Sequence, residues 1–89
     1  MDDAYRTAAR SQAQLLLTTC DSLLVMRDIT GDPIPDGTYT KGDGSAVAGE
    51  LDGISDIIDY TVVVADGKTV SATVVTQGDN GTIEETVTA

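Results

Sequence analysis

Three aspartates in the middle of the chain are the first residues whose type and spacing could do chemistry. Asp32, Asp36 and Asp43 each lie within one or two residues of a glycine. Carboxylates and loop carbonyls are the ligands that Ca²⁺ prefers, so these residues are weak candidates for a calcium site. A calcium-binding loop of the EF-hand type beginning at Asp32 would place Ile34 at a ligand position and Asp43 where a bidentate glutamate is required. Turn formation by aspartate beside glycine is the simpler interpretation.

A second acidic group could in principle hydrolyse a substrate. Asp52, Asp56 and Asp59 are spaced so that they share one side of a short helical turn. Two carboxylates can act as acid and base when burial raises the pKa of one of them. These three are expected on the solvent face, where no such burial is available. We therefore predict no catalytic residues among them.

Histidine is absent from the sequence, and a single cysteine is present. Nucleophile and histidine pairs, and zinc sites with imidazole ligands, cannot be built within one such chain. Cys20 lies among regularly spaced apolar residues, which indicates a buried structural thiol, with an intermolecular disulfide as the alternative. The glycines between 42 and 49 lack the Lys-Thr ending of a phosphate-binding loop. The prediction is a protein that is not an enzyme and holds no cofactor.

The elements that would position any site are clearest in the last thirty residues. Runs rich in valine and threonine are separated by Asp66-Gly67 and by the turn residues 78–81. Branched side chains suit a pleated strand, and these dipeptides suit tight hairpins. The pattern predicts an antiparallel β-meander over residues 60–88. Alternation places Val70, Ala72 and Val74 on the buried face, together with Ile83 and Val87, and Glu85 beside them at a partly exposed edge.

The first third of the chain predicts a helix. Residues 2–30 contain no glycine or proline, and apolar residues recur near the helical period. Leu23 to Met26 is apolar without interruption, so residues 22–30 could finish the helix or form a buried strand. We predict a helix over 3–26 and leave the alternative open.

The middle of the chain carries weaker signals. Two prolines and several glycines predict an irregular loop region over 31–49, with Thr38–Thr40 as a short strand at most. Residues 50–58 regain a period, because Leu51, Ile54, Ile57 and Ile58 share one side. A short amphipathic turn is therefore expected there.

Together these elements predict one small α+β domain spanning residues 1–89. The amphipathic N-terminal helix would pack on an antiparallel sheet of three to four strands. The expected contact sets Leu16, Leu17, Cys20 and Leu24 against Val62, Val64, Val70, Val74 and Ile83. In an alternative arrangement the helix projects from a β-rich head and is buried only by a neighbouring molecule.

The net charge of −10 is uneven. Residues 1–30 carry four acids and three arginines, whereas residues 31–89 carry eleven acids and two lysines. Such a surface disfavours nucleic acid and anionic membranes and favours a basic partner or solubility at high salt, as in a halophilic host. Arg6 and Arg10 could face the acidic half of a second copy. No signal peptide or membrane span is evident, so synthesis in the cytoplasm is expected, with a virion as a possible destination.

These observations favour a non-catalytic structural subunit of a multi-copy assembly, for which a virion accessory or decoration protein of the capsid or tail is the leading hypothesis. Its partners would be copies of itself or a coat or assembly protein, and neither nucleic acid nor membrane. The alternative is an acidic binding module or inhibitor that occupies a basic site on a partner. The candidate interface residues are Arg6, Arg10, Leu17, Leu24, Thr82, Glu84, Glu85, Thr86 and Thr88.

Overall fold

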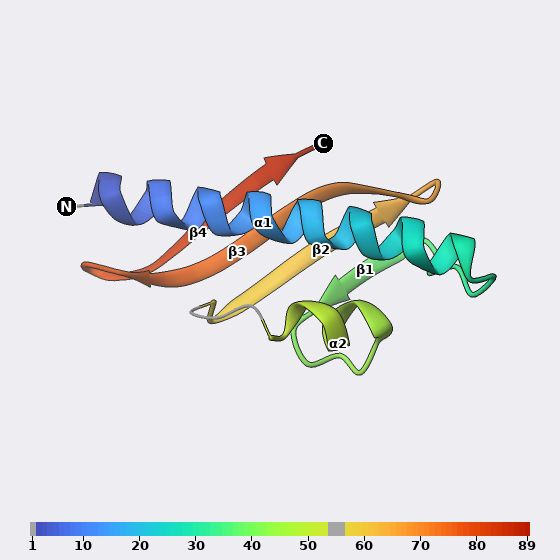
Figure 1. Ribbon diagram of the computed structural model, residues 1–89. Coiled ribbons are helices and arrows are strands. Elements are labelled where there is room, and N and C mark those ends of the chain that lie inside the picture. The colour runs from blue at the N-terminus through green and yellow to red at the C-terminus, as the bar shows by residue number, and fades with distance from the viewer. Residues whose placement is uncertain (1, 54–56) are drawn as a thin grey trace.

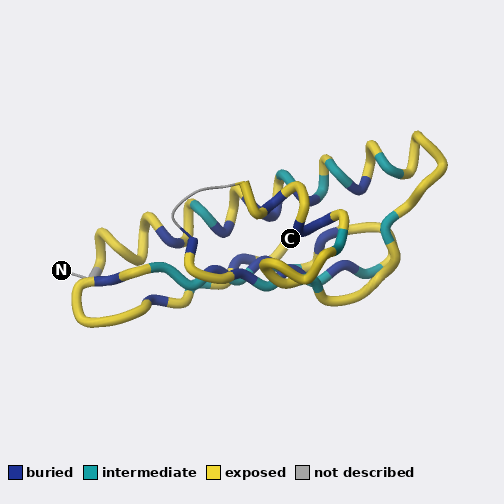
Figure 2. Tube along the Cα trace, turned by 90° about the horizontal axis from the view of Figure 1, so that it is seen from below, coloured by how far each residue is buried: buried dark blue, intermediate teal, exposed yellow. Residues whose placement is uncertain are grey.

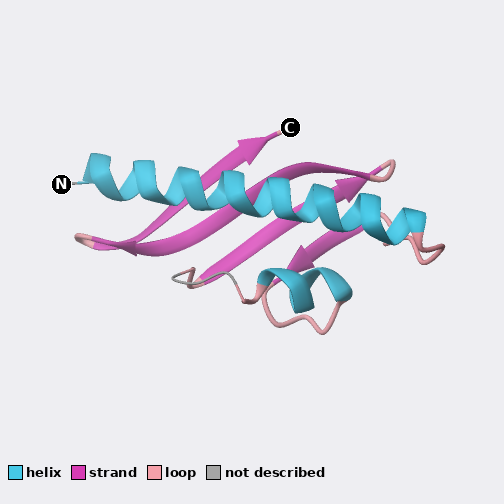
Figure 3. Ribbon diagram, viewed as in Figure 1, coloured by secondary structure: helices cyan, strands magenta, loops and turns pink. Residues whose placement is uncertain are grey.

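A computed structural model describes residues 2–53 and 57–89 of the chain. The elements are α1 (Asp2–Ile29), β1 (Gly37–Thr40), α2 (Ala46–Leu51), β2 (Asp59–Ala65), β3 (Lys68–Gly78) and β4 (Gly81–Thr88). Helix α1 crosses one face of the sheet, so the molecule has two layers (Figures 1 and 3). The predicted α+β architecture, with the N-terminal helix packed on an antiparallel sheet, is confirmed.

The sheet is a four-stranded antiparallel meander in the order β1-β2-β3-β4. The turn between β2 and β3 is a two-residue hairpin at Asp66 and Gly67, whose φ angles are 54° and 73°. Positive φ at both positions is what the favoured hairpin turn requires. The short β1 adds the fourth strand by pairing with β2, from Gly37 opposite Val64 to Thr40 opposite Thr61.

The core lies between α1 and the inner face of the sheet (Figure 2). Helix α2 packs against α1 and β1. Leu16, Cys20 and Leu24 recur on the helix face that meets the sheet, and all three are buried. Tyr60, the largest buried side chain, replaces the absent phenylalanine and tryptophan as an aromatic anchor. The helix therefore does not project from a β-rich head but covers its own sheet.

The predicted burial of Val70 is wrong, because the pairing of β2 with β3 is irregular. The register shifts between Val63 and Val64, so that Val63 lies opposite Ser71 and Val64 opposite Thr69. One additional residue on β3 reverses the alternation beyond that point. Thr69 consequently points into the core with no exposed surface, while Val70 is 44% exposed.

Helix α1 continues through Ile29, so residues 22–29 are helical and not a strand. Its end is defined by local sequence. Gly31 has a φ of 83°, its N–H bonds to the Asp28 carbonyl, and the Asp32 N–H bonds to the Arg27 carbonyl at 2.9 Å. This pair of bonds is a Schellman motif, which stops a helix at a glycine. The predicted end at residue 26 was three residues too early.

The middle of the chain is more regular than predicted. Residues 31–49 include β1 and part of α2, which begins where the Ser45 hydroxyl accepts a bond from the Ala48 N–H at 3.1 Å. Of the amphipathic turn predicted over 50–58, only residues 50 and 51 are helical among those that the structure describes, since α2 ends at Leu51. Ile57 is buried but Ile58 is 51% exposed; Ile54 and Asp56 lie outside the described residues. The serine cap, three residues before Ala48, was the overlooked signal.

Candidate interaction surface

Two of the three proposed calcium ligands form separate local contacts. Asp36 accepts hydrogen bonds from the N–H groups of Asp66 at 3.1 Å and Gly67 at 3.4 Å, which ties the loop before β1 to the β2–β3 turn. Asp32 forms an ion pair with Arg27 at 2.7 Å. Each carboxylate therefore stabilises a turn or a helix end in its own part of the fold.

Asp43, the third proposed ligand, organises the start of α2. Its carboxylate accepts hydrogen bonds from the N–H groups of Thr40 and Ser45, both at 2.9 Å, and from the Ser45 hydroxyl. These bonds, with that of the Ser45 hydroxyl first, lower the pKa of Asp43 below its ordinary value. Within residues 2–53 and 57–89, no three acidic or cysteine side chains lie close enough together to hold a metal ion.

The two described members of the second acidic group, Asp52 and Asp59, are likewise in structural contacts. The Tyr60 hydroxyl donates to Asp52 at 2.6 Å, and Asp59 accepts from the Tyr60 N–H at 2.8 Å. Burial, and then the bond to Asp52, raises the pKa of the Tyr60 phenol above its ordinary value. Asp52 was predicted to point only to solvent, and its contact with Tyr60 instead fastens the end of α2 to β2.

This contact predicts a loss of stability at alkaline pH. The folded state holds Tyr60 neutral, so its contribution is complete below the phenol pKa of the unfolded chain, about 10, and is lost as the pH rises above that value. Tyr60→Phe is expected to lower stability at pH 8 by about 1 kcal/mol, because Asp52 loses its donor, but to flatten the decline above pH 10. Thermal unfolding of both proteins between pH 8 and 11 tests this, and parallel declines would contradict it.

Cys20 lies in the core, as predicted, and is a free thiol. Burial raises its pKa above the ordinary value, which disfavours the reactive thiolate. The next residue, Asp21, makes one polar link between the two layers, because its carboxylate accepts from the N–H of Thr69 at 2.9 Å. Asp21 thereby satisfies a backbone donor at the point where the register of the sheet shifts.

Removing that link is expected to destabilise the fold. Asp21→Ala would leave the Thr69 N–H without an acceptor beneath the helix, at a cost of about 1–2 kcal/mol. Asp21→Asn keeps a carbonyl oxygen in the same place and is the matched control, with an expected loss of less than about 0.5 kcal/mol. Urea unfolding followed by circular dichroism measures both, and equal losses would show that the bond to Thr69 is not the cause.

The two arginines predicted to face another molecule are engaged within their own chain. Glu85 lies on the inner face of β4, between Ile83 and Val87, and its side chain is only 18% exposed. It pairs with Arg6 at 3.1 Å and with Arg10 at 3.7 Å. The two guanidinium groups remain 55% and 65% exposed, so they can also meet a further acidic group. Leu17 and Leu24, also predicted at an interface, are buried in the core.

The side of α1 that faces away from the sheet carries no charged residue. We call this line of exposed residues the outer stripe. Its members are Ala4, Ala8, Ser11, Leu15, Thr18, Ser22, Val25, Met26 and Ile29. The large apolar ones are substantially open to solvent, with Leu15 at 47%, Val25 at 59%, Met26 at 63% and Ile29 at 78%. Figure 2 shows the outer side of α1 uncovered along its length.

The outer face of the sheet is also uncovered, and on β4 it is polar. Thr82, Glu84, Thr86 and Thr88 are exposed on β4, and the Thr86 and Thr73 hydroxyls lie 2.8 Å apart across the two strands. These are the remaining interface residues predicted from the sequence. Hydroxyls that satisfy one another in this way, beside a glutamate, make a face well suited to water.

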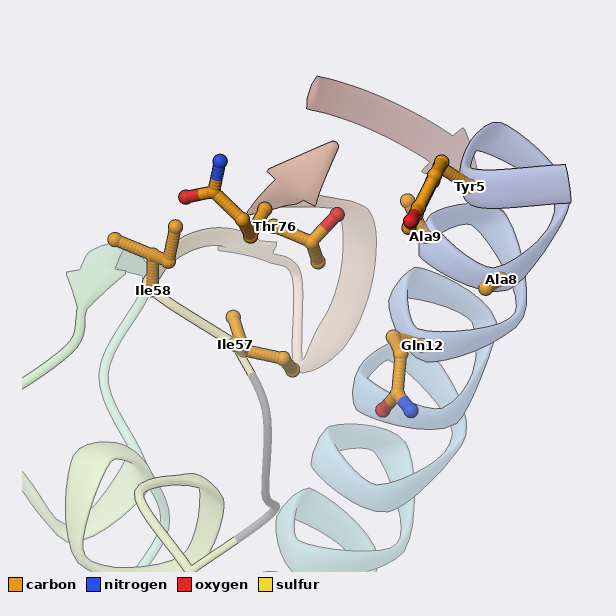
Figure 4. A pocket seen from close by; sticks show the side chains of 8 residues that line it. Tyr5, Ala8, Ala9, Gln12, Ile57, Ile58 and Thr76 are labelled. Carbon is orange, nitrogen blue, oxygen red and sulfur yellow. The ribbon is translucent and has the colours of Figure 1, made fainter. Parts of the chain in front are cut away.

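Two grooves flank α1. One, of about 550 Å³, lies between the N-terminal half of the helix and the ends of β2 and β3 (Figure 4). It is lined by Tyr5, Ala8, Ala9, Gln12, Ile57, Ile58, Thr76 and Gln77. The other, of about 540 Å³, runs along the C-terminal half and includes Leu17, Val25, Met26 and Ala89. Ala8 of the outer stripe lines the first groove, and Val25 and Met26 line the second.

The remaining structural findings are negative. In the part of the chain that the structure describes, no helix is long and apolar enough to cross a membrane. Comparison of the chain with protein-family models, with curated proteins and with solved structures finds no significant match.

Proposed function

We propose that this protein is a non-catalytic structural subunit of a multi-copy assembly, such as a virion shell or tail. The outer stripe of α1 carries the proposal. Ile29, Met26 and Val25 expose apolar surface that burial would stabilise, at roughly 25 cal/mol for each Å² removed from water. An exposed, contiguous apolar surface on a small protein is characteristic of a protein contact.

The absence of charge on the outer stripe supports the same proposal. Fifteen acids and five basic residues are present in 89 residues, and the solvent face of a helix is where charges ordinarily gather. None lies on the outer stripe, although Asp3, Arg10, Asp21 and Asp28 lie along one flank of it. A helix face without charge over its whole length is typical of a protein–protein contact, because charged residues are depleted at the centre of such contacts.

The alternative of an acidic binding module has less support. Such a module needs carboxylates clustered on one face and free to meet a basic partner. Asp36, Asp43 and Asp52 instead accept hydrogen bonds from backbone or side-chain groups of their own chain. The acidic surface that remains serves solubility.

Self-association of the purified chain tests the proposal. Sedimentation equilibrium up to about 1 mM, a concentration that detects weak binding, is expected to show concentration-dependent association. Replacing Val25 and Ile29 together with glutamate should abolish it while circular dichroism stays unchanged. Val70→Glu is the matched control, because Val70 is 44% exposed but lies on β3 and lines neither groove beside α1. A wild-type chain that stays monomeric over this range would contradict the proposal.

A further inference from the structure

We infer that the outer stripe binds the outer stripe of a second copy of this chain, with the two α1 helices antiparallel and centred between Leu15 and Thr18. The inference rests on the proposed function and adds the partner, the orientation and the register. It is carried by three features of α1: the spacing of the outer stripe, the sizes of its residues, and the charges beside it.

The spacing of the outer stripe is that of a helix–helix seam. Its residues follow one another at alternating steps of four and three, in the order Ala4, Ala8, Ser11, Leu15, Thr18, Ser22, Val25 and Ile29. Any one face of an α-helix repeats at steps of three and four, so these positions form a nearly straight seam that a second helix can meet at a shallow angle.

Residue sizes along the outer stripe favour the antiparallel orientation. The N-terminal half is small, with Ala4, Ala8 and Ser11, and the C-terminal half is large, with Val25 and Ile29. Antiparallel pairing about the stated centre sets Ala4 opposite Ile29 and Ala8 opposite Val25 of the second copy. Each layer then combines a small side chain with a large one, which keeps the interaxial distance even. Parallel pairing would crowd one end and leave a gap at the other.

The charges beside the outer stripe favour the same orientation. At about 100° for each residue, Arg6, Arg10, Asp21 and Asp28 fall along one flank of the helix. The basic pair lies in the first half, beside Asp3, and the acidic pair lies in the second half. Antiparallel pairing sets this flank against the same flank of the second copy and brings Arg6 towards Asp28 and Arg10 towards Asp21. Parallel pairing would set it against the opposite, uncharged flank of Gln12 and Thr19 and would form no such pairs. Arg6 and Arg10 are more than half exposed and can reach a second carboxylate besides Glu85.

The expected contact is small. The outer stripe runs over about 38 Å of helix, and a single helix pair covers roughly 400 Å² on each copy, about half the usual area of a stable complex. We therefore expect an isolated pair to have a dissociation constant in the high micromolar range. Such a contact becomes effective when an assembly repeats it, because linked weak contacts reinforce one another.

Cross-linking through introduced cysteines tests both orientation and register. Ala8→Cys and Val25→Cys lie in exposed positions that face each other only in the antiparallel pair. Oxidation of an equal mixture of the two variants is expected to give the mixed disulfide in at least about tenfold excess over either self-disulfide, because pairing raises the effective concentration of those two thiols. The unmodified chain is the control, since Cys20 is fully buried.

Two outcomes would overturn the inference. A Val25→Cys chain that forms its own disulfide more readily than the mixed one would show a parallel pair. A mixed disulfide no more abundant than that formed with Thr38→Cys, on the outer face of the sheet, would show random collision. Either result, obtained with a chain that associates in sedimentation, leaves the proposed function standing; a chain that never associates removes both.

Discussion

Leu17→Asp is expected to unfold the isolated chain. Leu17 is only 6% exposed and belongs to the core cluster between α1 and the sheet. Replacing Leu17 with aspartate loses the burial of the leucine, about 2–5 kcal/mol. It also buries a carboxyl group that has no positive partner among the described core residues, so that the total cost reaches about 5 kcal/mol or more. A domain of this size is stable by roughly 5 kcal/mol at the lower end of the usual range, and this core contains no phenylalanine or tryptophan. Most molecules should therefore be unfolded at 25 °C.

Leu15→Asp is the matched control for Leu17→Asp. Leu15 is the same residue type two positions earlier in α1, but it is 47% exposed on the outer stripe. We expect its urea midpoint to stay close to that of the unmodified chain, with a change of less than about 0.5 kcal/mol. Far-ultraviolet circular dichroism and urea titration distinguish the two variants. Equal stability of both would show that α1 does not pack on its own sheet in solution.

Gly78→Ala is expected to destabilise the fold by about 2–3 kcal/mol, through overpacking. Gly78 ends β3 on the inner face, where the side chain of Ile83 lies over it. A Cβ added at Gly78 would be 2.6 Å from both Cγ1 and Cδ1 of Ile83 and 3.0 Å from the Gly81 carbonyl oxygen. Ile83 can turn only part of its side chain away, and the hairpin backbone would have to move as well.

Gly49→Ala, in α2, is the control for Gly78→Ala and should change stability in the opposite direction. A Cβ added at Gly49 would have no atom within 4 Å other than those of its chain neighbours and of the backbone of its own helix, and the residue is helical. Alanine is favoured over glycine in a helix, so a gain of about 0.5–1 kcal/mol is expected. Differential scanning calorimetry of both variants gives the comparison. A Gly78→Ala protein as stable as the unmodified chain would show that Ile83 is free to rearrange.

The parts of the fold that sequence predicted well are those that depend on neighbours in the chain. The strands of the meander were located because Val and Thr runs alternate with residues that permit tight turns, as the positive φ angles of Asp66 and Gly67 show. Helix α1 was located because Leu16, Cys20 and Leu24 recur at the helical period. Both patterns extend over only a few consecutive residues, so they can be recognised in the sequence without knowledge of the tertiary structure.

Two errors, the end of α1 and the start of α2, missed the local caps at Gly31 and Ser45. The other errors arose where distant segments decide the outcome. The inward position of Thr69 follows from the register shift against Val63 and Val64, which the β3 sequence alone does not encode. The bonds from Asp21 to Thr69, from Asp36 to the Asp66 turn and from Tyr60 to Asp52 join segments separated along the chain. Sequence periodicity predicts that these aspartates are exposed or near turns, but it does not predict which groups donate hydrogen bonds to them.

The sequence by itself determined the two secondary structure types, their order and the charge of the molecule, because propensity, periodicity and ionisation belong to local residues. The apolar face of α1 was also predicted from the sequence, but only the tertiary structure decided that this face packs on the chain's own sheet and not on a neighbouring molecule. Packing on the sheet buries the face of α1 that carries Leu16, Leu17 and Cys20 and leaves the outer stripe exposed. Since a helix can bury only one side against a single sheet, the free side, uncharged from Ala4 to Ile29, became recognisable as a candidate contact once the buried side was known.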